Sequence, residues 1–283
     1  MAMAGLQLIA GQVAVVTGAA SGIGRAIAAE CSSRGMRVVL ADIDTNGLDG
    51  LAAELAGQGR EGLAMRCDTA SSTDVQELAE VVAGRYGQVH LLVNNAGVAG
   101  AAGPSWMIGE ADWKWTLDVN LFGPVNVLRG FLPRMIEGGV PGWVINIASL
   151  SGLLPTPGAA PYSASKAALL ALSEALSLEL KQAGAPIGVT IACPAAVATS
   201  IASSLRPSSP DAGDAVQTSA SALACGMAPE EAARRILAAA EDGRFSLFTH
   251  AGSEAVVTER NRRLLEGADP VRPDWDLVSP SGA

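Results

Sequence analysis

The sequence predicts an α/β protein in which helices cover both faces of one doubly wound, parallel sheet. Short apolar runs alternate along the chain with longer Ala-rich stretches of helical pattern, the order that parallel strands joined by crossover helices require. The apolar runs are continuous, as in strands that are buried on both faces. Apolar residues make up 49% of the 283 residues and charged residues 17%. This composition predicts a large core and excludes a disordered chain.

Seven short runs rich in Val, Ile and Leu predict the strands. They cover Val13–Thr17, Arg37–Asp42, Leu63–Cys67, His90–Asn94, Trp143–Ser149, Ile187–Cys193 and Phe245–Phe248. Helical patterns between them cover Gly22–Arg34, Gly47–Ala56, Ser72–Tyr86, Glu110–Glu137, Tyr162–Ala183 and Pro229–Glu241. Gly35, Gly57 and Gly184 follow three of these helices, where glycine favours helix termination. Pro229, followed by two Glu residues, is typical of a first helical turn.

No linker divides the chain, so residues 1–283 are expected to form a single domain. Residues 200–227 interrupt the alternation, because this stretch is rich in Ser, Ala, Pro and Asp and has little periodicity. A loop of this length inside a compact domain is typically functional, and we expect a lid over the substrate. Residues 267–283 contain three prolines and are expected to form an irregular C-terminal arm.

The charge balance of 19 basic against 28 acidic residues gives a net charge of −9. Such a surface repels phosphate polymers, so neither nucleic acid nor an anionic membrane is an expected partner. No apolar run approaches the roughly 18 residues of a membrane span, and Met1–Val16 has no basic residue of the kind a signal peptide needs. The four cysteines contain no C-x-x-C pair, which indicates buried thiols in a reducing compartment. We therefore expect a cytoplasmic protein without a metal site.

A glycine-rich turn follows the first expected strand and precedes the first expected helix. Gly18, Gly22 and Gly24 allow a sharp turn there and let backbone N–H groups at the helix N-terminus approach a pyrophosphate. The spacing is G-x-x-x-G-x-G rather than the commoner G-x-G-x-x-G, and a glycine cluster alone also fits an ordinary turn. Its position between a strand and a helix favours dinucleotide binding.

Asp42 ends the second expected strand, 18 residues after the last glycine of this turn. A carboxylate near this distance accepts hydrogen bonds from the adenosine ribose and repels a 2′-phosphate. Neither Ser21 in the turn nor Ile43 after the acid is basic, so we expect NAD as the cofactor. Arg25 is expected to be solvated or structural, and Asp44 to be an ordinary turn acid.

Tyr162 and Lys166 are four residues apart on an expected helix, so their side chains share one face. A free tyrosine has a pKa of about 10. A neighbouring ammonium favours the phenolate, so we expect Lys166 to lower the pKa of Tyr162 and make it an acid/base for an alcohol oxygen. Ser149 follows an apolar strand, where its hydroxyl can polarise the same oxygen. Tyr-x-x-x-Lys alone also occurs by chance on the surface of amphipathic helices.

Several motifs together resemble the short-chain dehydrogenase/reductase family. They are Thr17–Gly24, Asn94-Asn95-Ala96-Gly97, Asn120, Ser149 and Tyr162-Ser163-Ala164-Ser165-Lys166. Their order and spacing, with Ser149 placed 13 residues before Tyr162, resemble the family over roughly residues 11–250. The resemblance implies a single Rossmann-like domain of the NAD type, assembled as a homotetramer or dimer.

The resemblance also implies roles for single residues. Tyr162 would exchange the proton and Ser149 would hold the substrate oxygen, so both would contact substrate. Lys166 would tune Tyr162 and bind the nicotinamide ribose, and Asn120 would feed a proton relay through a water. The implied cofactor positions are Gly18, Ser21, Gly22, Ile23, Gly24, Asp42, Ile43, Asp68, Thr69, Asn95, Ala96, Gly97, Tyr162, Lys166, Val197 and Thr199. Ala195 stands where the family usually has a glycine, ahead of Val197.

These roles imply hydride transfer between NAD(H) and a secondary alcohol or ketone. The few charges of residues 200–227 favour an apolar or aromatic substrate. Two alternatives stay open. An NAD-dependent epimerase or dehydratase would use a different glycine spacing and a larger C-terminal domain. A non-catalytic NAD-sensing protein would need only the phosphate loop and Asp42.

Other conspicuous side chains are expected to be structural. Trp113 and Trp115 are interpreted as core or subunit-contact residues, and His90 and His250 as structural or surface residues. The two long helices carry apolar residues on more than one face, which predicts a subunit contact; on the second of them these include Leu169, Leu172, Leu176 and Leu180.

Overall fold

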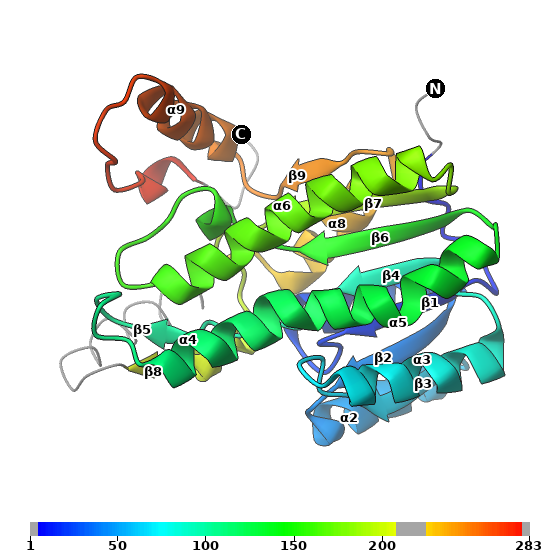
Figure 1. Cartoon of the computed structure of the whole chain (residues 1–283). Helices are drawn as coiled ribbons and strands as arrows, with labels where there is room; N and C mark the ends of the chain where they lie inside the picture. The colour runs from blue at the N-terminus through cyan, green and yellow to red at the C-terminus, as the bar shows by residue number, and fades with distance from the viewer. Residues whose placement is uncertain (1–4, 208–224, 279–283) are drawn as a thin grey trace.

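The computed structural model describes residues 5–207 and 225–278, and it confirms the doubly wound α/β fold (Figure 1). Within these residues, seven parallel strands form one sheet. In spatial order they are β3 (Gly62–Arg66), β2 (Arg37–Asp42), β1 (Val13–Thr17), β4 (Leu91–Asn94), β6 (Gly142–Ile147), β7 (Ile187–Cys193) and β9 (Ser246–Phe248). The chain therefore moves outward from β1 to β3 and then continues on the other side of β1.

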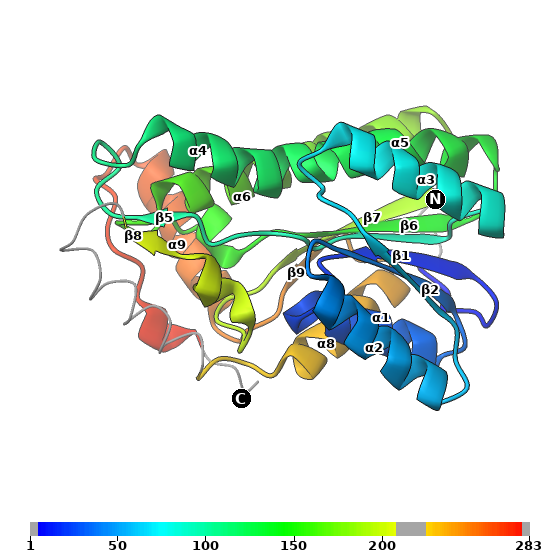
Figure 2. The ribbon, with the colours of Figure 1, turned by 90° about the horizontal axis from the view of Figure 1, so that it is seen from below.

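Helices cover both faces of the sheet, which explains why its central strands are mostly apolar and buried (Figure 2). One layer holds α3 (Ser72–Tyr86), α4 (Glu110–Leu117), α5 (Gly123–Glu137) and α6 (Ala160–Gln182). The other holds α1 (Gly22–Ser33), α2 (Thr45–Gly57) and α8 (Pro229–Glu241). Every residue of β1, β4, β6 and β7 is buried. Burial of apolar surface at about 25 cal/mol per Å² makes this core the main stabilising contribution.

The strand order reverses between the neighbours β1 and β4. Loops that leave the carboxyl ends of two such strands diverge toward opposite faces of the sheet and open a crevice between them. The glycine-rich turn follows β1, and residues 95–97 follow β4. The fold therefore brings these two motifs together at the carboxyl edge of the sheet.

The helix expected over Glu110–Glu137 is interrupted by a π-helical turn at Asp118–Phe122, between α4 and α5. Pro124 explains the position of the interruption. It has no N–H to donate to the carbonyl of Asn120, four residues earlier, so a regular α-helical hydrogen bond cannot form there. The Gly123 N–H instead reaches the carbonyl of Asp118, five residues back. Such single π turns inside α-helices are frequent at functional sites.

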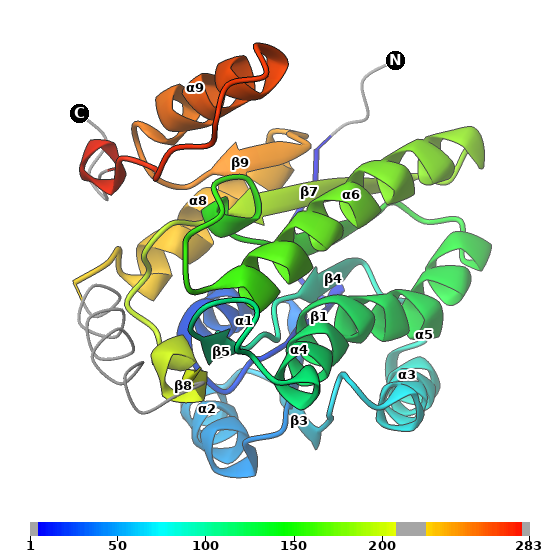
Figure 3. The ribbon, with the colours of Figure 1, turned by 60° about the vertical axis from the view of Figure 1, so that its left-hand side comes forward.

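Two short strands and one helix of the described chain were not predicted. Ala101–Ala102 (β5) pairs in parallel with Arg206–Pro207 (β8), a contact too short for a periodic signal. Helix α9 (Ser253–Leu265) lies beside β9 at the edge of the sheet (Figure 3). Val256 and Val257 are its only buried apolar residues among those described, so its sequence shows little helical periodicity.

The expected lid over residues 200–227 falls mostly on residues 208–224, which lie outside the described residues. The described ends of this stretch are anchored. Ser200–Ser204 forms a 3₁₀ turn, β8 pairs with β5, and Val197 bridges Met227. The lid itself stays a prediction.

The leucines expected at a subunit contact instead pack inside the chain. Leu169, Leu176 and Leu180 of α6 are buried and Leu172 is packed against the same core. Of the cysteines, Cys31, Cys67 and Cys193 are buried as expected, whereas Cys225 is exposed. No helix in the described part of the chain is long and apolar enough to cross a membrane.

Candidate active site

A cleft of about 530 Å³ lies at the carboxyl edge of the sheet, over the crevice between β1 and β4. Its lining gathers residues from Gly18 to Ser204, most of which lie at or after the ends of six different strands or belong to α4 and α6. Every residue that the sequence predicted for the site lines it except Gly24 and Asn120. Those two lie immediately behind the lining.

The glycine-rich turn is built around backbone conformations that favour glycine. Gly18 has φ +66° and Gly22 has φ +55°. A Cβ atom on Gly24 would lie 2.2 Å from the Gly18 carbonyl oxygen, so only glycine lets the loop and the helix approach this closely. Asn95 supports the turn from below, because its Nδ2 donates to the carbonyls of Thr17 (2.9 Å) and Gly18 (3.1 Å).

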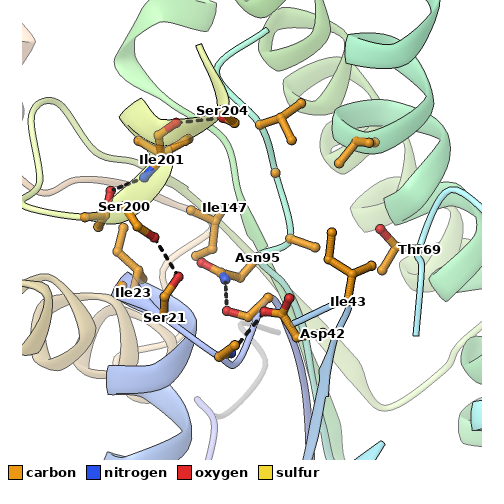
Figure 4. A pocket seen from close by; sticks show the side chains of 18 of the residues that line it. Ser21, Ile23, Asp42, Ile43, Thr69, Asn95, Ile147, Ser200, Ile201 and Ser204 are labelled. Atoms are coloured by element: carbon orange, nitrogen blue, oxygen red, sulfur yellow. Dashed lines mark hydrogen bonds between the residues drawn. The ribbon is translucent and has the colours of Figure 1, made fainter. Parts of the chain in front are cut away.

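The N-terminus of α1 points into the cleft without a side-chain cap. Ser21, at the N-cap position, makes no capping hydrogen bond, and the first turn carries no acidic residue. The Oγ of Ser21 lies 2.9 Å from the Oγ of Ser200, which links the turn to the segment after β7 (Figure 4). Uncapped N–H groups at the positive end of a helix dipole form a site for an anion such as a pyrophosphate.

Asp42 presents its carboxylate to the same cleft at the end of β2 (Figure 4). Oδ2 accepts from the Ala20 N–H and Oδ1 from the Asp44 N–H, each at 3.0 Å, so the carboxylate is held in place by backbone groups. Ile43 follows with 63% of its surface exposed beside the opening. Asp44 caps α2 by accepting from Gly47, and Arg25 pairs with Glu54 at 2.5 Å. Both thus have the structural roles expected of them.

The segments after β3, which lies beside Asp42, and after β4 form a further part of the cleft wall. Asp68 and Thr69 follow β3, and their loop is fixed by the Asp68 carboxylate, which accepts from Ala70, and by Asn126, which donates to the Thr69 carbonyl. Asn95, Ala96 and Gly97 follow β4 and line the cleft as one continuous stretch of backbone.

Ser149, Tyr162 and Lys166 meet at the inner end of the cleft. Helix α6 starts at Ala160 with Pro161 in its first turn, which places Tyr162 and Lys166 on successive turns facing the end of β6. The Lys166 ammonium lies 5.8 Å from the centre of the Tyr162 ring and donates to the Ile147 carbonyl at 2.9 Å. Ser149 accepts from the Ser151 N–H, and its hydroxyl donates to the Pro194 carbonyl at 3.4 Å.

The pKa of Tyr162 is raised, whereas the sequence predicted that Lys166 would lower it. Burial raises the pKa of this phenol above its usual value, and hydrogen bonding by Ser149 lowers it only in part. Lys166 does not reverse the shift, because its ammonium is directed at the Ile147 carbonyl and not at the phenolic oxygen. Burial also lowers the pKa of Lys166 to about 8. The two side chains lie close together, as their spacing predicts, but burial shifts the pKa of each in the direction that disfavours its charged form.

Asn120 lies fully buried on the π-helical turn. Its Oδ1 accepts from the Val98 N–H (2.8 Å), and its Nδ2 donates to the Val98 carbonyl (2.9 Å) and to the Ser165 hydroxyl (3.0 Å). Two of these three hydrogen bonds go to the backbone of Val98, so the side chain fixes the cleft wall just after Gly97. A Cβ atom built on Gly97 would lie 3.2 Å from Asn120 Oδ1 and 3.4 Å from Lys166 Nζ, so the three residues are close neighbours.

The segment after β7 closes the cleft. Val197 is buried and bridges Met227, and Thr199 caps the 3₁₀ turn at Ser200–Ser204. The Thr199 side chain also packs against Gly22, where an added Cβ would approach it to 2.9 Å. This segment and the glycine turn therefore face each other across the opening.

Trp115, interpreted from the sequence as a core or subunit-contact residue, belongs to the site. Its side chain lines the cleft, and the Arg206 guanidinium lies 3.6 Å from its ring centre in a cation–π contact. The two residues belong to α4 and β8 and are far apart in sequence, so no local pattern relates them. Ile201, Ser203 and Ser204 also line the cleft and were expected only as part of a lid.

Comparisons with known proteins agree with this geometry. A model of the short chain dehydrogenase family matches residues 12–210. The 1-deoxy-11-beta-hydroxypentalenate dehydrogenase of Streptomyces avermitilis is 38% identical over 242 residues, which cover 85% of each chain. A short chain dehydrogenase/reductase from Burkholderia phymatum, solved in complex with NAD, is 34% identical with a TM-score of 0.91, covering 95% of this chain and 99% of that one. A metagenomic short-chain oxidoreductase solved in complex with NADP is 32% identical with a TM-score of 0.70, covering 86% and 98%.

Proposed function

On the premise that this chain belongs to the short-chain dehydrogenase/reductase family, we propose that it is an NAD-dependent dehydrogenase of apolar secondary alcohols. Membership of this family gives the class of reaction: hydride transfer between a nicotinamide dinucleotide and an alcohol or ketone. The preference for NAD, the residue roles and the substrate are our proposals.

The observation that supports the proposal best is a single cleft that joins the two halves of the chemistry. At one end, the glycine turn, the uncapped start of α1 and Asp42 fit a dinucleotide. The three glycines let the turn pack this closely, because an added Cβ would lie 2.6 Å from Asn95 at Gly18, 2.9 Å from Thr199 at Gly22 and 2.2 Å from the Gly18 carbonyl oxygen at Gly24. At the other end, Ser149, Tyr162 and Lys166 fit a reacting alcohol. A dinucleotide bound along the cleft supplies a hydride acceptor or donor at its nicotinamide ring.

The side chains at the inner end then have complementary roles. Tyr162 takes the hydroxyl proton of the alcohol during oxidation and returns it during reduction. Ser149, which lines the same end of the cleft as Tyr162, holds the substrate oxygen beside the phenol. Lys166 carries a positive charge next to the Tyr162 ring, which favours the phenolate as the proton moves. The Asn120 side chain fixes the cleft wall at Val98. The main-chain carbonyl of Asn120 receives no hydrogen bond from Pro124, which has no N–H, and can therefore accept one from a relay water.

The test of this proposal is oxidation of a broad panel of secondary alcohols, followed by NADH absorbance. We expect turnover with apolar or ring-bearing alcohols, because the substrate end is lined by Trp115, Val98 and Ile201. Tyr162→Phe should reduce turnover by about 10²–10⁴ while NADH binding changes little, since the ring and its packing remain. NADH binding without turnover on any alcohol would instead favour the non-catalytic sensor.

We infer the preference for NAD from Asp42 and its surroundings. Among the described residues that line the cleft, Lys166 is the only basic one, so nothing at the Asp42 end offsets repulsion of a 2′-phosphate. Replacing Asp42→Ala together with Ile43→Arg should narrow or invert the ratio of kcat/KM for NAD over NADP. Efficient use of NADP by the unmodified enzyme would contradict the role given to Asp42.

We also propose that the protein works in the cytoplasm as a homo-oligomer. The buried free thiols of Cys31, Cys67 and Cys193 are typical of a reducing compartment. Assembly as a tetramer or dimer is part of the proposal.

A further inference from the structure

His250 lies two residues after the end of β9, behind the loop of residues 194–199 that closes the cleft. Only 4% of its surface is exposed. Pro194, Ala195, Val197 and Thr199 line the cleft, whereas the histidine is on the other side of this loop. A buried histidine needs hydrogen-bond partners for both ring nitrogens, and here the loop supplies most of them.

The contacts of the ring define its protonation. Nε2 lies 2.9 Å from the Ala196 carbonyl oxygen, which can only accept, so Nε2 carries the proton. Nδ1 then acts as the acceptor in a neutral ring. It is 2.8 Å from the Thr249 hydroxyl and receives the Ala195 N–H at 3.4 Å. The ring thus binds the N–H of one loop residue and the carbonyl of the next.

Other hydrogen bonds to the loop come from Ser149 and from backbone groups of Leu150 and Met227. The Pro194 carbonyl accepts from the Leu150 N–H at 2.9 Å and from the Ser149 hydroxyl. The Ala196 carbonyl accepts a second hydrogen bond from the Met227 N–H at 2.9 Å. His250 is therefore the side chain that holds the middle of the loop, between Ser149 on one side and Val197 on the other.

We propose that His250 is a positioning residue that, in its neutral Nε2–H form, holds the loop of residues 194–199 where it can receive the nicotinamide end of the cofactor. This inference rests on the proposed function, which gives Val197 and Thr199 their contact with the nicotinamide. Protonation of Nδ1 turns it into a donor facing the Ala195 N–H, so the cationic ring cannot keep both loop contacts. Cofactor affinity should therefore fall when His250 becomes protonated.

The charges around His250 favour the neutral ring. Burial lowers the pKa of His250 below its usual value, the hydrogen bond to Ala196 raises it in part, and the Arg235 guanidinium lowers it further. Arg235 of α8 is paired with Glu231 and donates to the Thr249 carbonyl at 2.6 Å. Asp242, Arg244 and Glu254 line the same hollow. The ring is thus neutral at pH 7, and the acid-induced change is expected below the ordinary histidine pKa of about 6.5.

The chain has two histidines, which makes a direct test possible. Nitrogen-15 NMR of the imidazoles in the full chain, without cofactor, should show His250 as the Nε2–H tautomer with a depressed pKa. NADH affinity should be measured by fluorescence between pH 5 and pH 8 for the unmodified protein, His250→Gln and His250→Leu. His90→Gln and His90→Leu are matched controls, because His90 hydrogen-bonds Val13 at the opposite end of the sheet.

We expect His250→Leu to weaken NADH binding about ten-fold at pH 7, and His250→Gln to weaken it less because its amide still donates. Both should lose the acid-side decline in affinity, and the His90 variants should keep it. Thr249→Val, which removes one partner of Nδ1, should act in the same direction if His250→Leu does not fold. An Nδ1–H tautomer, or unchanged affinity in a folded His250→Leu protein, would overturn the proposal. Absence of NADH binding by the unmodified protein would instead overturn the proposed function.

Discussion

Tyr162 shows how one residue depends on opposing environmental effects. Its position beside Lys166 suggests a phenol that ionises easily, yet burial raises its pKa and the Ser149 hydrogen bond compensates only in part. The resting enzyme therefore holds a protonated phenol at neutral pH. Alcohol oxidation, which needs the phenolate as base, should accelerate as the pH rises into the alkaline range.

This direction can be measured without any substrate, because the chain contains only two tyrosines. In a Tyr86→Phe background, ultraviolet titration of the remaining phenol should give a pKa above the ordinary value of about 10. Adding Ser149→Ala should move the titration to still higher pH, because the hydrogen bond that lowers the pKa is lost. A pKa well below 10 for Tyr162 would contradict this prediction and would mean that the charge of Lys166 determines the pKa.

Lys166 illustrates a conflict between stability and function at a single residue. Burial lowers its pKa to about 8 from an ordinary 10.5, so the folded state binds the proton more weakly than the unfolded state. The destabilisation caused by this lowered pKa is complete below pH 8 and disappears as the pH rises toward 10.5. Lys166→Met should therefore raise the free energy of unfolding at pH 7. The expected gain is about 2 kcal/mol, which already allows for the lost hydrogen bond to Ile147. The same substitution should abolish activity.

Thermal melting at pH 7 and pH 10 checks this prediction. The gain in Tm of Lys166→Met over the unmodified protein should be several degrees at pH 7 and should shrink at pH 10. Lys181→Met, which changes an exposed lysine on the same helix, should show no such dependence on pH. A Lys166→Met protein that is less stable at both pH values would contradict it.

At the scale of elements, the approach of the glycine turn to α1 sets the shape of the cofactor end. Gly24→Ala places a Cβ atom 2.2 Å from the Gly18 carbonyl oxygen and 2.3 Å from Asn95 Nδ2, so the turn must move. We expect NADH affinity to fall at least ten-fold and Tm to decrease. Isothermal titration calorimetry and thermal melting measure the two effects.

Gly50→Ala is the matched control, because Gly50 is exposed on the outer side of α2 and has nothing within 4 Å of an added Cβ. It should stabilise the protein by about 0.5–1 kcal/mol and leave NADH affinity unchanged. Equal NADH affinities for Gly24→Ala and Gly50→Ala would show that the turn does not hold the dinucleotide.

The π-helical turn is the second element whose local chemistry shapes the site. Pro124 follows Asn120 by four residues, and the resulting break lets the Asn120 side chain turn toward Val98. The proline is visible in the sequence, but its effect is not, because a proline near the start of α5 is equally compatible with a new helix. The structure shows instead a continuous helical path with one wide turn.

For the whole molecule, the outer surface of the layer formed by α3 to α6 is where we expect assembly. Phe122 is 52% exposed and Leu178 is 66% exposed, although both are large and apolar. Closed symmetric assembly is the usual way to cover such residues. Light scattering at micromolar concentration should give a dimer or tetramer, and Phe122→Glu combined with Leu178→Glu should give a monomer.

Leu265→Glu is the control for this surface, since Leu265 of α9 is 88% exposed and lies on a different part of the molecule. It should leave the oligomeric state unchanged. A monomeric unmodified protein would contradict the assembly, without bearing on the chemistry of the cleft.

Local patterns in the sequence were sufficient for the sheet, most helices, the glycine-rich turn and the pairing of Tyr162 with Lys166, and the family resemblance added further residues that line the cleft. Continuous apolar runs such as Val13–Thr17 report burial on both faces, and glycines at fixed spacing report a turn that no other residue can adopt. Both signals are properties of short segments, so they do not depend on distant contacts. The motifs after β1, β4 and β6 can therefore be identified from the amino-acid order alone.

The tertiary structure alone decided everything that depends on desolvation or on long-range contact. The raised pKa of Tyr162 comes from burial by the surrounding chain, and Trp115 joins the cleft only because α4 and β8 are packed together. His250 acquires its partners at residues 195 and 196 by the pairing of β7 with β9. The physical reason is the same in each case. The burial and the contacts of a residue depend on segments that are distant in the chain, and a local sequence pattern contains no information about those segments.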